Sequence, residues 1–189
     1  SFQSGDKINV VPGRASMIVD GVAEDVIRAA AEKTEGATGV SFRVKALADG
    51  GVQVDAKGQA AHASTPEEGK NALTAMLQLI AELPLEQSKG KEALLGLHAM
   101  FPYEDTCGKT VGIYRENEES GAVTVCFSIM DYTKTHLHAA FDARLPIGCN
   151  EENTKLPVKA AAEKYGMELE DLPLNPPHCV PGDSWFVQT

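Results

Sequence analysis

Apolar and polar residues follow two different periods along the first half of the chain. Within residues 52–57 they alternate one by one, which is the pattern of a half-buried strand. Within residues 66–83 apolar residues recur every three or four positions, which is the pattern of a helix that buries one face. The same reasoning predicts strands over 8–19, 40–48 and 51–61 and helices over 23–34 and 66–83. This βαββα order is typical of a ferredoxin-like unit.

The helix over 66–83 has a sharply defined expected start. Thr65 and Glu68 have the spacing of a capping box, in which the side chain of each residue accepts a hydrogen bond from the backbone N–H of the other. Pro66 stands at the first helical position, where its missing N–H costs nothing. We therefore expect the helix to begin directly after Thr65.

The second half of the chain repeats the mixture of helical and strand periods. The expected elements are a helix over 91–100, an irregular segment through 110, a hairpin of strands 123–129 and 137–145 with its turn at 131–134, a helix over 151–165 and a strand over 167–174. The expected fold class is α/β (α+β), with two ferredoxin-like βαββα-type subdomains. Their expected bounds are 1–86 and 87–176.

His62 falls between the end of a predicted strand and the start of a predicted helix. A histidine in that position either caps the turn by bonding a local carbonyl or presents its ring to a ligand. The residues around it favour a ligand. Residues 58–72 read Gly-x-x-Ala-His-Ala-Ser-x-Pro-x-x-Gly-x-Asn-Ala, and this motif resembles the lid (dimerisation) domain of the M20 zinc peptidases.

Three other segments agree with this resemblance in order and spacing. Residues 9–12 read Asn-Val-Val-Pro, and residues 142–146 read Asp-Ala-Arg-Leu-Pro. Residues 177–184 resemble the exit from such a lid into a catalytic domain, so 177–189 is expected to be an exit segment. The resemblance covers nearly the whole chain. Its length resembles the longer lid of the dipeptidase V type, which implies a dipeptidase that is a monomer.

The resemblance implies two zinc ions, bound by a catalytic domain. No histidine here is followed two residues later by Asp, and no His-Glu-x-x-His motif is present, so no metal ligand is expected within this chain. We expect an excised inner domain that is inactive alone and closes over its own catalytic domain. The expected substrate is a dipeptide.

Three residues receive site roles from the resemblance. His62 is expected to stabilise the oxyanion that forms during peptide hydrolysis. Arg144 is expected to bind the terminal carboxylate, because its planar fork suits that group; the alternative is a surface ion pair with Asp142. Asn9 is expected to bind substrate, or else to be a turn residue ahead of Pro12. For His136 and His138 a polar sheet face is favoured over a metal site.

The composition excludes some classes of partner. A net charge of −10 argues against nucleic acid and anionic membranes, both of which need a basic surface. Four cysteines without Cys-x-x-Cys spacing favour free thiols and a cytoplasmic location. Two other functions stay open, namely the lid of an M20 N-acyl-amino-acid deacetylase (aminoacylase) and a non-catalytic ferredoxin-like module that binds a small molecule.

Overall fold

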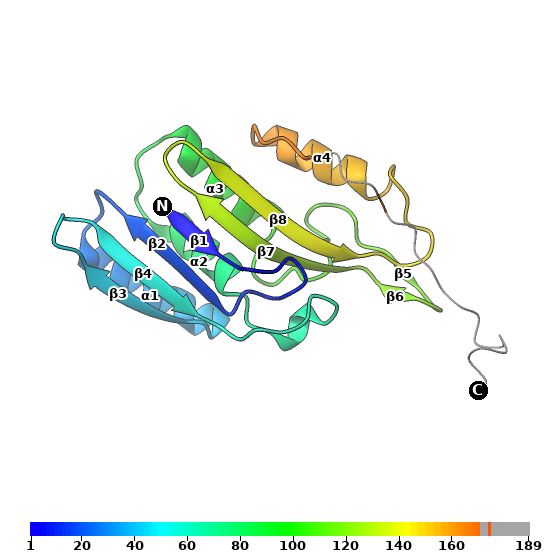
Figure 1. Ribbon diagram of the computed structural model, residues 1–189, viewed down its shortest axis with the longest axis horizontal. Coiled ribbons are helices and arrows are strands. Elements are labelled where there is room, and N and C mark those ends of the chain that lie inside the picture. The colour runs from blue at the N-terminus through cyan, green and yellow to red at the C-terminus, as the bar shows by residue number, and fades with distance from the viewer. Residues whose placement is uncertain (171–173, 175–189) are drawn as a thin grey trace.

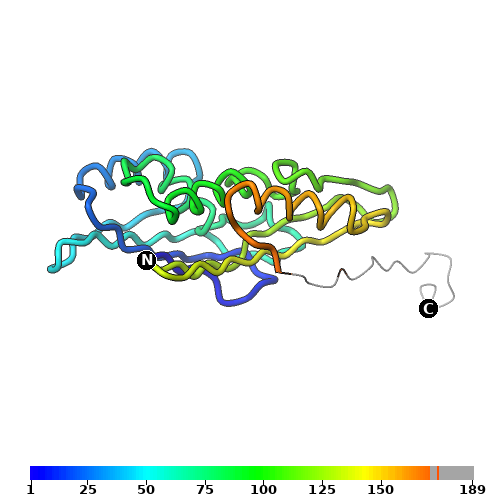
Figure 2. Tube along the Cα trace, turned by 90° about the horizontal axis from the view of Figure 1, so that it is seen from above, coloured from blue at the N-terminus to red at the C-terminus, as the bar shows by residue number. Residues whose placement is uncertain are grey.

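A computed structural model describes residues 1–170 and residue 174. One six-stranded sheet carries the helices on one of its faces (Figures 1 and 2). Its strands, in the spatial order β3-β4-β2-β1-β7-β8, are all paired antiparallel. The strand bounds are β1 Phe2–Ser4, β2 Arg14–Val19, β3 Ser41–Ala46, β4 Val52–Lys57, β7 Thr124–Tyr132 and β8 Leu137–Arg144. The helices are α1 Glu24–Thr38, α2 Ala72–Glu82, α3 Lys89–Met100 and α4 Lys155–Lys164.

The first half confirms the predicted βαββα order. Strands β2, β4 and β3 form one side of the sheet, and α1 and α2 pack on it. Ile27 of α1, Val54 of β4 and Met76 of α2 are fully buried at this contact. Helix α1 is longer than predicted and ends at Thr38. Gly39 follows it with a φ of 67°, a left-handed conformation that glycine adopts without strain.

The strand predicted over 8–19 begins only at Arg14, so the prediction was wrong for 8–13. These residues belong to the loop between β1 and β2, which lies on the face of the sheet away from the helices (Figure 2). The sequence analysis also missed β1. Three residues are too few to show a period, yet β1 pairs with β2 on one side and β7 on the other. It therefore joins both halves of the chain in one sheet, and the boundary at residue 86 stays a prediction.

The predicted hairpin is confirmed as β7 and β8, with one irregularity. Phe127 pairs with Phe141, whereas Ile129 pairs with Ala140, so Ser128 is an extra residue in β7. The bulge reverses the alternation that follows it, so Met130 is buried, whereas regular alternation with Val125 and Phe127 would have buried Ile129. Strand β7 also runs further than expected, which moves the connection from 131–134 to 133–136.

The helix predicted over 66–83 was wrong in its first part. Residues 66–68 form a single 3₁₀ turn, and α2 begins at Ala72. Gln59 and Lys70 exchange two backbone hydrogen bonds of 2.9 Å, which hold residue 70 in an extended bridge and out of the helix. The capping box does not form. Asn71 caps α2 instead, because its Oδ1 accepts from two backbone N–H groups in the first turn.

The last part of the chain was predicted less well. Helices α3 and α4 are confirmed, although α4 is shorter than the predicted 151–165. A short hairpin of β5 (Glu116–Asn117) and β6 (Gly121–Ala122) was missed. Residues 167–170 form no strand, so that part of the predicted strand over 167–174 was wrong. The predicted exit segment 177–189 lies outside the described residues.

Asn71 gives a test of the fold. Its amide also donates to the carbonyl of Phe127 at 2.9 Å, so one side chain caps α2 and ties it to β7. Replacing Asn71 by Ala should lower the free energy of unfolding by about 2 kcal/mol, from the lost cap and the unpaired carbonyl. Urea denaturation measures this. Asn117→Ala, which removes a similar turn bond at an exposed loop, is the control, and equal effects of the two variants would contradict the role of Asn71.

Candidate functional site

The turn that carries His62 is held against the loop between β1 and β2. The N–H of Val11 donates to the carbonyl of Ala61 at 2.9 Å, and the N–H of Ala63 donates to the carbonyl of Asn9 at 3.0 Å. Val10 and His62 face each other in the resulting bridge. Two residues predicted to act on one ligand, Asn9 and His62, are therefore neighbours.

The imidazole of His62 is exposed and has a defined orientation. Its Nδ1 accepts from the backbone N–H of Ser64 at 3.2 Å and lies 2.7 Å from the Ser64 hydroxyl. A backbone N–H can only donate, so Nδ1 must be the acceptor nitrogen. In the neutral ring the proton is then on Nε2. The turn therefore presents a hydrogen-bond donor to whatever lies beyond the ring.

A second contact connects this turn to the strand end that carries Arg144. The hydroxyl of Thr124 donates to the carbonyl of Ala63 at 3.2 Å. Thr124 is the first residue of β7 and pairs directly with Arg144 at the end of β8. Hydrogen bonds and strand pairing thus connect the segments that carry Asn9, His62 and Arg144, which come from three distant parts of the sequence.

Beneath the turn, Val11, Ala63 and Cys126 form a small buried cluster. Burial raises the pKa of the Cys126 thiol, an effect that a hydrogen bond from Ser128 partly opposes. A thiol held in the neutral form is a poor nucleophile. We therefore assign Cys126 a packing role, in which the cluster holds the turn against β7.

Arg144 contacts Asp142 in this structure. Its NH2 lies 2.7 Å from Asp142 Oδ2, so the ion pair that was the alternative interpretation of Arg144 is present. The Arg144 side chain is 50% exposed, whereas that of Asp142 is only 14% exposed. The guanidinium keeps further N–H groups that can bind another carboxylate.

Metal binding is not supported within the described residues. His136 and His138 are both exposed on the β8 side of the hairpin. Among residues 1–170, no three His, Cys, Asp or Glu side chains are placed to hold a metal ion. The residues described here thus do not fit a zinc site of their own. No helix in the same part of the chain is long and apolar enough to cross a membrane.

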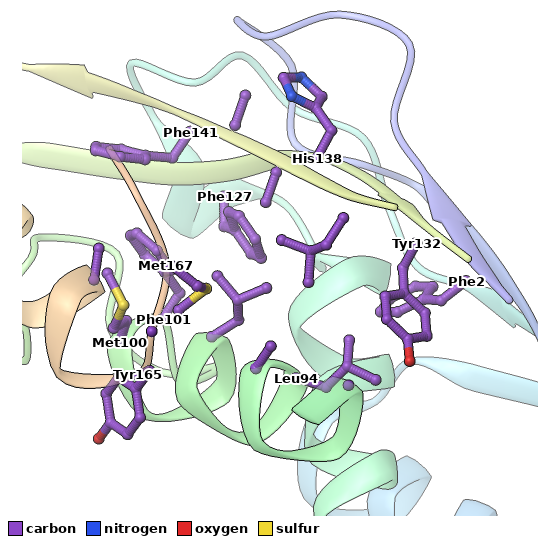
Figure 3. A pocket seen from close by; sticks show the side chains of 18 of the residues that line it. Phe2, Leu94, Met100, Phe101, Phe127, Tyr132, His138, Phe141, Tyr165 and Met167 are labelled. Carbon is purple, nitrogen blue, oxygen red and sulfur yellow. The ribbon is translucent and has the colours of Figure 1, made fainter. Parts of the chain in front are cut away.

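A cavity that the sequence analysis missed lies between α3, α4 and the β7–β8 hairpin (Figure 3). Its volume is about 2240 Å³, and Phe101 stacks on Phe127 at 4.7 Å between ring centroids inside it. Figure 3 shows the His138 ring on the side of β8 away from Phe127. Asn9 and Arg144 are among the lining residues of this cavity, whereas His62 is not. The sequence could not predict this cavity, because it depends on how α4 packs along the β7–β8 hairpin.

Sequence reasoning also missed the partners of the predicted site residues. Ser64 sets the protonated nitrogen of His62, and Thr124 connects the turn to β7. Ser64 lies two residues from His62, so a local search would have found it, whereas the contact of Asp142 with Arg144 was already the alternative interpretation of Arg144. Thr124 is distant from Ala63 in sequence, and only the hairpin register could have identified it.

Comparison with known proteins gives a consistent family. The sequence profile of the peptidase dimerisation domain of the M20 peptidases matches residues 50–145, about half of the chain. The whole chain aligns at 28% identity with 39% of a Beta-Ala-Xaa dipeptidase from Lactobacillus delbrueckii subsp. lactis. It aligns at 25% identity with 40% of "Putative dipeptidase YtjP" from Bacillus subtilis and at 24% with 40% of a Staphylococcus aureus USA300 protein, also named "Putative dipeptidase". The chain spans about two fifths of these relatives.

The orientation of the His62 ring can be measured directly. We expect the neutral imidazole to carry its proton on Nε2, because the Ser64 N–H occupies Nδ1. Long-range ¹H–¹⁵N correlation spectra of the neutral ring distinguish its two tautomers. The exposed ring of His136, which has no recorded hydrogen bond among the described residues, provides the reference. A protonated Nδ1 in His62 would contradict the geometry.

Proposed function

Because the chain belongs to the M20 peptidase dimerisation-domain family, we propose that it is the lid of a peptidase that hydrolyses dipeptides. The observation that supports the proposal is that a hydrogen-bond donor and a half-exposed guanidinium stand on connected elements. The Thr124–Ala63 hydrogen bond joins the turn that carries His62 to the strand pair that ends at Arg144. The names of the relatives support a dipeptide as substrate.

His62 would act on the scissile carbonyl. Negative charge grows on the carbonyl oxygen when a peptide bond is attacked, and a donor already in position stabilises it without reorganising. The Nε2–H of His62 is such a donor, held by the bridge to the β1–β2 loop and by Ser64. Because the turn is tied to the sheet, the donor would move with the lid as one unit.

Arg144 would bind the terminal carboxylate of the substrate. Its guanidinium is half exposed and has donors beyond the one that Asp142 uses. A carboxylate held there would place the scissile bond relative to His62 and would separate a dipeptide from an internal peptide bond. Asn9, whose carbonyl holds the His62 turn, would contact the same substrate through its side chain.

The rest of the parent protein completes this proposal. The family resemblance implies two zinc ions, and the described residues offer no group that fits one. In this proposal both ions would be bound by the catalytic domain of the parent protein. That domain is the expected partner of the lid. The three cysteines in the described residues are free, which supports the expected cytoplasmic location.

Replacing His62 by Ala in the full-length peptidase should lower kcat about 100- to 1000-fold and change KM much less. The reason is that the donor acts on charge that appears only in the transition state. Steady-state kinetics with a dipeptide measure both constants. His136→Ala removes an exposed histidine at the other end of β8 and should leave them unchanged. An unaltered kcat in His62→Ala would refute the oxyanion role.

Replacing Arg144 by Lys should raise KM for dipeptides at least tenfold, because an ammonium group does not reproduce the planar fork. Steady-state kinetics measure this change. Full activity of Arg144→Lys would contradict a role of Arg144 in binding the terminal carboxylate.

A comparison of substrates distinguishes the alternative functions. N-acyl amino acids carry the same terminal carboxylate as dipeptides and are assayed in parallel with the wild-type enzyme. Faster turnover of N-acyl amino acids than of dipeptides would identify a deacetylase. Absence of hydrolysis with both substrates, together with tight binding of a small molecule, would favour the binding module.

A further inference from the structure

The carboxylate of Asp142 is built into the place where Arg144 would meet a substrate. Asp142 lies two residues before Arg144 on β8, its side chain is 86% shielded, and its Oδ2 lies 2.7 Å from the guanidinium. Across the hairpin it pairs with buried Cys126. Within the described residues, its one recorded ion pair is with Arg144. This negative charge is therefore fixed in position.

The charges of Arg144, Asp142 and a bound terminal carboxylate do not sum to zero. Arg144 contributes one positive charge, and Asp142 already neutralises it. A terminal carboxylate on the free edge of the guanidinium adds a second negative charge, so the group as a whole becomes negative. A further anion brought in by the substrate would be repelled.

We propose that Asp142 determines specificity at the C-terminal residue of the substrate. It disfavours dipeptides whose C-terminal side chain is a carboxylate, and it favours neutral or cationic side chains. This inference rests on the proposed function, since it requires Arg144 to hold the terminal carboxylate. At an assumed separation of roughly 7 Å between the side chain of the substrate's C-terminal residue and Asp142, two like charges near a protein surface would change relative rates about 3- to 50-fold.

The experiment compares substrates that differ only in charge. In the full-length peptidase, kcat/KM is measured for Ala-Glu and Ala-Gln, which have nearly the same shape. The wild-type protein should prefer Ala-Gln by roughly 3- to 50-fold. In Asp142→Asn most of this preference should disappear. Any effect of the variant on Arg144 or on folding acts on both substrates and cancels in the ratio.

A second pair of substrates tests the sign of the effect. Ala-Lys should be preferred over Ala-Met in the wild-type protein, and Asp142→Asn should reduce this preference as well. Asp20→Asn is the matched control, because Asp20 is an exposed carboxylate beside Lys134, at the other end of the β8 hairpin. It should leave both ratios unchanged. Higher ionic strength should weaken both wild-type preferences, because salt screens exposed charges.

The outcomes separate this inference from the function it rests on. If Arg144→Lys loses activity but both ratios are the same in Asp142→Asn and in wild type, Asp142 does not set specificity and the lid function stands. If Arg144→Lys keeps full activity, the carboxylate role itself fails. Ratios that change equally in Asp142→Asn and Asp20→Asn would show an effect of net charge alone and would overturn the assignment to Asp142.

Discussion

The three-residue strand β1 is the constraint on which the site depends. It pairs with β2 on one side and β7 on the other, so the halves of the chain share one sheet. The loop that leaves β1 holds the His62 turn through Asn9, and β7 holds the same turn through Thr124. Without β1, the two halves would share no sheet, and the hydrogen bonds of Asn71 and Thr124 would remain to connect the His62 turn with β7.

The turn after β4 shows how backbone pairing overrides local sequence preference. Its Thr-x-x-Glu spacing and Pro66 favour a helix from that point, yet the bridge between Gln59 and Lys70 delays α2 to Ala72. Gly58 permits this, because a Cβ on it would lie 2.0 Å from the carbonyl oxygen of Lys70. The delay leaves residues 61–65 as a rigid turn, and a rigid turn can orient an imidazole better than a fraying helix end.

The sequence predicted the elements with long, regular periods and the residues inside family motifs. Elements α1, β4 and the β7–β8 hairpin each bury one face, and a buried face leaves a clear period. Strand β1 and the bulge at Ser128 leave no such period, because the pairing partners that define them are distant in sequence. The hydrogen bond between Thr124 and Ala63 was missed for the same reason, since these residues are also distant in sequence. Motif spacing selected the candidate residues His62, Arg144 and Asn9, but it did not reveal the contacts of Ser64 and Thr124 with the His62 turn.

The central claim is that His62 and Arg144 act on the same substrate molecule. The most direct test is a crystal structure of the full-length peptidase with a dipeptide analogue that carries a tetrahedral oxyanion in place of the scissile carbonyl. The account predicts His62 Nε2 about 3 Å from the oxyanion and the Arg144 guanidinium on the terminal carboxylate of the same molecule. An analogue bound in the closed enzyme without contact to either side chain would contradict it.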